Sequence, residues 1–157
     1  MNFFVLMTLY AAFCGMAFSQ GPNPKIIAQI AISKNNKNKQ GIVLSSPQDL
    51  ATFFNMPEPD AKSFVEGLLK VPQINFDSQM LLVIQGGECR TGGFKVIFKS
   101  CEIKANQLQV HWQLQGPPPD AFVTQALTYP ALIVLTEKYK GEVKFIQSMA
   151  QEKRTTP

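Results

Sequence analysis

The residues that could carry catalytic chemistry are few and scattered. His111 is the single histidine of the 157-residue chain, so a Ser/His/Asp or Cys/His triad would have to use it. No motif places a nucleophile or an orienting acid beside it, and it lies on the glutamine-bearing side of an alternating segment. We therefore expect an exposed strand histidine and a protein that is not an enzyme.

Signatures of cofactor and metal chemistry are absent from the sequence. It contains no GxGxxG, GxxxxGK[ST] or HExxH motif. One histidine rules out a histidine-rich metal centre, and the eleven carboxylates are scattered rather than paired for glycoside chemistry. We expect no catalytic residue, no cofactor and no metal.

Cys89 and Cys101 are the two cysteines that follow the N-terminal apolar segment. In an oxidising compartment, two cysteines favour a disulfide. A straight strand from Phe94 to Cys101 would span about 23 Å at ~3.3 Å per residue, whereas a bridge needs Cα atoms within ~7 Å. Composition favours the bridge and geometry opposes it, so both alternatives stay open. Their spacing, with no further ligands, excludes a zinc pair.

The glycine-rich segment 86–93 (GGECRTGG) is the most informative local feature. Four glycines in eight residues predict a loop that uses positive φ angles. No helix follows to add a dipole, so an anion site is less favoured than a recognition loop. Arg90 offers a planar, multi-donor side chain. We predict a binding surface made of Arg90, Thr91, Gly92, Gly93 and Phe94, with a strained turn that binds nothing as the alternative.

Strands must hold this loop. The continuous apolar runs 80–85 and 131–135 predict buried strands. The alternating segments 94–103 and 108–114 predict strands with one face in the core, joined by a tight turn at Ala105–Asn106. We also expect strands at 26–33, 42–44 and 142–147 and an extended stretch at 121–129. Burial is predicted for Phe94, Phe98, Trp112 and Ile133.

Two short helices are predicted before the C-terminal strands. Ser46, Pro47 and Asp49 form a helix start, and Pro57 and Pro59 should end that helix. A second helix is expected from Asp60 to Lys70, and an apolar stripe on it should enter the core: Phe64, Val65, Leu68 and Leu69.

The elements together predict one α+β, mainly β domain over residues 25–148, an antiparallel β-sandwich or barrel-like fold. Residues 20–24 are a predicted linker and 149–157 a predicted polar tail. The basic segment 34–40 has no arginine and no aromatic residue, so we expect a solvated turn and no nucleic-acid partner.

A targeting segment is predicted at the N-terminus. Phe3 to Phe18 is uncharged and apolar but short of the ~20 residues that span a bilayer. It ends in Ala17-Phe18-Ser19, which fits cleavage after Ser19. We expect residues 1–19 to be a signal peptide, the mature protein to be secreted or extracytoplasmic, and no membrane span to remain after its removal.

Several segments resemble the PrcB-type protease-complex subunit family. Residues 74–77 (INFD) and the strand after them resemble its entry segment, 87–94 (GECRTGGF) its T-G-G-aromatic segment, and 124–130 (TQALTYP) its closing segment. The resemblance covers roughly residues 74–138. Asn75 stands where the family pattern has Asp, and the cysteines are not part of that pattern.

This resemblance implies a small exported protein that accompanies a protease, because the namesake is an accessory subunit of a surface protease complex and no catalytic family is involved. The T-G-G-aromatic loop is also similar to a loop of chagasin-type cysteine-protease inhibitors. Three functions follow: a non-enzymatic accessory or assembly subunit for a protease or other exported protein; an inhibitor acting through the 88–94 loop and the proline loop at 116–120; and, third, an enzyme using His111.

Overall fold

The computed structural model describes residues 22, 24, 26–31 and 40–148. The predicted signal peptide (1–19) and polar tail (149–157) fall outside the described residues, as does most of the predicted linker. The described elements are β1 (Ile26–Ala31), β2 (Gln40–Leu44), α1 (Pro47–Phe54), α2 (Glu58–Leu69), β3 (Gln79–Gln85), β4 (Lys95–Lys104), β5 (Gln107–Gln115), β6 (Pro130–Glu137) and β7 (Glu142–Gln147).

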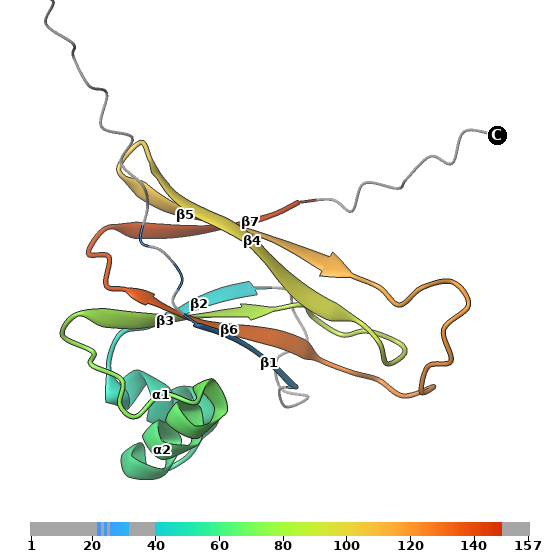
Figure 1. Cartoon of the computed structure of the whole chain (residues 1–157), viewed down its shortest axis with the longest axis horizontal. Coiled ribbons are helices and arrows are strands. Elements are labelled where there is room, and N and C mark those ends of the chain that lie inside the picture. Colours follow the sequence, from blue (N-terminus) through green and yellow to red (C-terminus); the bar gives the residue numbers. More distant parts are fainter. Residues whose placement is uncertain (1–21, 23, 25, 32–39, 149–157) are drawn as a thin grey trace, which may run out of the picture.

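The strands form two sheets, which confirms the mainly β, α+β prediction. One sheet has the order β1-β6-β3-β2 and is antiparallel throughout, and the other has the order β4-β5-β7. The described strands do not close into a barrel. The predicted antiparallel pairing has one exception among the described strands, since β7 runs parallel to β5. The short link after β6 reverses the chain and leads it into the other sheet. For this reason β7 lies beside β5 and not beside β6 (Figure 1).

Both faces of the four-stranded sheet are buried. One face packs against the helices through Leu81, Val83 and Ile133. The opposite face packs against the three-stranded sheet through Leu82, Ile84, Leu132 and their neighbours. A strand covered on both sides has no polar face, which is why 80–85 and 131–135 read as continuous apolar runs and not as alternating ones.

The helix starts follow local chemistry. Ser46 caps α1, and its hydroxyl accepts a hydrogen bond from the Asp49 amide at 3.1 Å. The Asp49 carboxylate accepts from the Ser45 amide at 2.8 Å. The second helix begins at Glu58, earlier than predicted, because Pro59 lies in its first turn, where no amide hydrogen is needed.

Three aromatic side chains are less buried than predicted. Phe64 is 46% exposed and packs edge-on against Phe54 at 5.4 Å, while Val65 and Leu69 carry the buried face of α2. Phe94 and Phe98 are only half-buried. Phe94 lies before β4 begins, and the register of β4 shifts just after Phe98, so the alternation does not continue in one phase.

Of the remaining predictions about the β region, those on core burial and on the hairpin turn are confirmed, and the one on residues 121–129 is wrong. Trp112 and Ile133 are buried as predicted. Ala105 and Asn106 both have positive φ, 49° and 59°, as a two-residue hairpin turn requires. The stretch 121–129 is not a strand, since its pairing is a single isolated bridge between Thr128 and Cys89.

Candidate functional site

Two connections meet at the end of the sheets away from the helices: 86–94 between β3 and β4, and 116–129 between β5 and β6 (Figure 1). They are joined by backbone hydrogen bonds. Cys89 and Thr128 exchange two such bonds at 2.9 Å, and the Gly92 amide donates to the Thr124 carbonyl at 2.9 Å. We call these two segments the joined loops.

Side chains strengthen the junction. The Thr128 hydroxyl donates to the Thr91 carbonyl at 2.8 Å, and the Tyr129 hydroxyl donates to Glu88 Oε2 at 2.9 Å. Tyr129 is only 8% exposed. Burial and, after it, the hydrogen bond and charge of Glu88 raise the pKa of Tyr129. The base of the loops is therefore tied on several sides before any partner is present.

Glycines permit this close approach. A Cβ at Gly92 would overlap the Thr124 hydroxyl. Gly93 has φ +83°, and a Cβ there would lie 2.8 Å from Cβ of Pro117. The structure thus places the glycines of the predicted site where a side chain is excluded, and their first role is to let the joined loops touch.

The joined loops expose apolar side chains that the sequence analysis did not single out. Phe122 is fully exposed at 107% and Leu127 is 53% exposed. Their exposure has no strong signal in the sequence, because the pattern at 121–129 predicts an extended stretch with an ordinary share of apolar residues. Arg90 is exposed on the other loop. Phe122, Leu127 and Arg90 therefore stand on one firmly held structure, and phenylalanine and arginine are among the residue types enriched at protein interfaces.

A groove of about 350 Å³ adjoins the joined loops. It is lined by Gln29–Ala31 of β1, by Gly93–Lys95 and by Thr128–Pro130. Of the predicted site residues, Gly93 and Phe94 line this groove. Thr91 and Gly92 hold the junction, and Arg90 lies exposed outside the groove.

Residues 80–137 match the family model described as PrcB C-terminal. Over these residues the chain is similar to PrcB C-terminal domains. The matched segment runs from β3 to the end of β6 and includes both joined loops. Comparisons with curated proteins and with solved structures give no match. The resemblance to the PrcB-type family is confirmed over this segment.

Within the matched segment, Cys89 and Cys101 are not bridged to each other. Cys89 is buried in the junction, whereas Cys101 lies on β4 opposite Val110. The Cys101 thiol donates to the Pro22 carbonyl at 2.7 Å, and burial raises its pKa. The two residues thus belong to different parts of the domain.

His111, also in the matched segment, is half-buried, with Nε2 3.4 Å from Glu102 Oε1. Ser100 pairs with it across β4 and β5. Among the described residues, no hydrogen bond joins the imidazole Nε2 to a hydroxyl group. The described residues also contain no cluster of three His, Cys, Asp or Glu side chains fit for a metal. In the same part of the chain, no helix has the length and apolarity needed to cross a bilayer.

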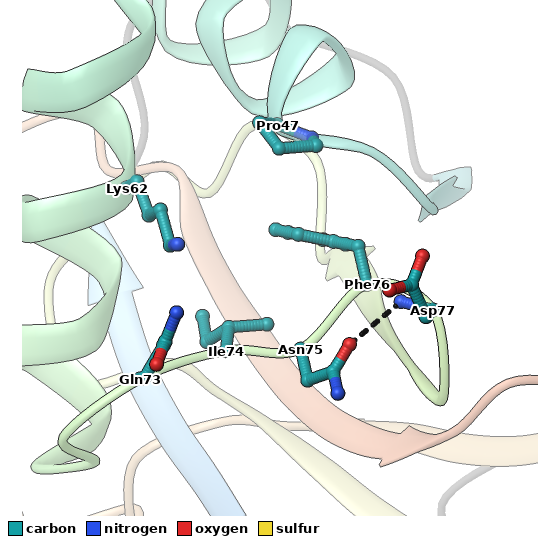
Figure 2. A pocket seen from close by; sticks show the side chains of 7 residues that line it. All are labelled: Pro47, Lys62, Gln73, Ile74, Asn75, Phe76 and Asp77. Atoms are coloured by element: carbon teal, nitrogen blue, oxygen red, sulfur yellow. Dashed lines mark hydrogen bonds between the residues drawn. The ribbon is translucent and has the colours of Figure 1, made fainter.

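A second hollow, of about 490 Å³, lies beside the helices (Figure 2). Lys62 of α2 and Pro47 of α1 border it on one side and the segment 73–77 on the other. The Asn75 side chain accepts a hydrogen bond from the Asp77 amide at 2.9 Å. The ammonium nitrogen Nζ of Lys62 lies 3.8 Å from Oε1 of Glu66. None of the predicted binding residues lines this hollow, and its Lys62 and Asn75 side chains are engaged in these local contacts.

Proposed function

We propose that the protein is a secreted, non-enzymatic accessory or assembly subunit that binds a protease or another exported protein through the joined loops. The PrcB C-terminal match supports an association with a protease complex. The apolar segment ending at Ala17-Phe18-Ser19 supports export.

One observation carries the proposal: exposed anchor side chains stand on loops that are already fixed. A partner that binds a mobile loop must order its backbone, at a cost of about 1–2 kcal/mol for each residue. Here the hydrogen bonds between Cys89, Thr128, Gly92 and Thr124 fix the backbone in advance. Phe122 is then free to fill an apolar pocket at little ordering cost.

The test is affinity capture of the native secretion fraction with the tagged protein, followed by measurement of affinity for the captured component. Phe122→Ala should weaken binding by about 2 kcal/mol, or roughly thirtyfold. Phe64→Ala, which truncates an exposed phenylalanine on α2, is the matched control and should bind as the wild type does. Equal affinity of both variants, with unchanged melting curves, would remove the joined loops from the interface.

A protease inhibitor is the second candidate, favoured by the joining of the 88–94 loop to the proline-containing loop, which presents two segments side by side. Titration against a papain-type cysteine protease separates the two functions. Loss of protease activity at stoichiometric protein, reversed by Phe122→Ala, identifies an inhibitor. Capture of a protease that stays fully active identifies an accessory subunit.

A further inference from the structure

An open strand edge borders the groove beside the joined loops. β1 is the terminal strand of the four-stranded sheet and β4 is the terminal strand of the three-stranded sheet. We propose that an extended segment of the partner protein lies in this groove and adds to the edge of β1 as an extra strand. The inference rests on the proposed function, because it names how the same end of the molecule takes its partner.

Pro130 determines which backbone groups β1 presents. Ala31 is paired with Pro130, which has no amide hydrogen. The Pro130 carbonyl accepts from the Gly86 amide at 2.8 Å, on the β3 side. The pair of Ala31 and Pro130 is therefore a non-hydrogen-bonded one, and the N–H and C=O of Ala31 point away from β6. By the alternation of an antiparallel ladder, those of Gln29 do so as well.

These outward groups belong to the residues that line the groove. Gln29, Ile30 and Ala31 form its β1 side. In the described part of the chain, no strand pairs with this edge of β1. An added strand would find a donor and an acceptor at Ala31 and again at Gln29, which is the spacing that strand addition uses.

The other walls of the groove are fixed in advance. The Phe94 ring packs over Gly116, where a Cβ would lie 3.3 Å from the ring. The Gln29 side chain donates to the Val96 carbonyl, which ties β1 to β4. Tyr129 is held by Glu88. A segment that enters this groove therefore meets a formed surface and does not have to create one.

The charge of the groove indicates which kind of partner segment would bind there. Among its described lining residues, Lys95 is the one charged side chain and it is exposed. Much of the remaining lining is apolar, including Ala31, Phe94 and Pro130. The fitting occupant is an extended segment with apolar side chains toward the groove and an acidic side chain near Lys95.

The probe is a phage-displayed library of random dodecapeptides, selected on the intact protein. We expect enrichment of segments that combine alternating apolar residues with an acid. Lys95→Glu should weaken a selected synthetic peptide about tenfold or more, whereas Lys99→Glu, an exposed lysine on the same strand, should not. Ala31→Pro removes the outward amide and should also weaken binding.

Backbone N-methylation of the peptide tests the strand geometry itself. Alternate amides of a bound strand point toward β1 and away from it. Methylation of the amides at one set of alternate positions should therefore abolish binding, and methylation at the other set should leave it intact. The inference would be overturned by the absence of an enriched peptide, by wild-type affinity in both Lys95→Glu and Ala31→Pro, or by methylation effects without this alternation. If Phe122→Ala weakens capture of the protein partner while Lys95→Glu and Ala31→Pro do not, strand addition is refuted and the proposed function stands.

Discussion

Gly93 offers the sharpest test of the joined loops, because two separate effects oppose a side chain there. Its φ of +83° costs a non-glycine residue about 1–2 kcal/mol. The new Cβ would also lie 2.8 Å from Cβ of Pro117, whose ring cannot rotate away. Relief of that overlap costs on the order of 1–3 kcal/mol. The lower entropy of alanine in the unfolded chain returns about 0.4–1 kcal/mol.

We therefore expect Gly93→Ala to lower the free energy of unfolding by about 2–3 kcal/mol, the balance of those three effects. In urea, with a slope of about 1–3 kcal/mol per molar, the midpoint should fall by roughly 1–2 M. Gly67→Ala is the matched control, since Gly67 lies inside α2 with no atom within 4 Å of a built Cβ. That change should stabilise the protein by about 0.5–1 kcal/mol. A Gly93→Ala midpoint at or above the wild-type value would refute the predicted strain.

Three further outcomes follow from the same structure. Trp112 is 3% exposed, so Trp112→Ala should cost about 3–5 kcal/mol in urea unfolding, and a loss under about 1 kcal/mol would contradict its burial. Burial raises the pKa of Asp49, but hydrogen bonds from Ser45 and Ser46 outweigh it and lower the pKa overall. Asp49→Asn should therefore destabilise the protein at neutral pH, and the difference should vanish as the pH falls through that lowered pKa. The pKa of Tyr129 is raised, so its contribution is present at neutral pH and is lost as the pH rises through that raised pKa. Tyr129→Phe should be less stable than the wild type at pH 7 and should lose less stability in strong alkali.

Local chemistry made part of the fold predictable. The cap at Ser46, the turn at Ala105–Asn106 and the alternation along 108–114 each depend on residues within a few positions of one another. Such signals do not depend on contacts with distant parts of the chain. The continuous apolar run 80–85 was also decisive, because only a strand buried on both faces tolerates it.

Long-range pairing was not predictable in the same way. The bridge between Cys89 and Thr128 joins residues from two connections, and neither connection shows a pairing pattern by itself. The parallel course of β7 depends on which sheet the chain enters after β6. Phe64 packs against Phe54 of α1 and stays 46% exposed, so helical periodicity identified the apolar side of α2 but not how much of it is buried.

The candidate site divides between two parts of the chain. The family match covers 80–137 and therefore includes both joined loops and the central strands that hold them. The open edge of the groove comes from β1, outside the match.

A binding mode common to PrcB C-terminal domains is therefore expected to depend on the joined loops. A preference particular to this chain is expected to depend on Gln29 and Ala31, because those residues present the outward backbone groups. Exchange of β1 should then change which peptides bind and leave the junction between Cys89 and Thr128 intact, since that junction lies wholly within the matched segment.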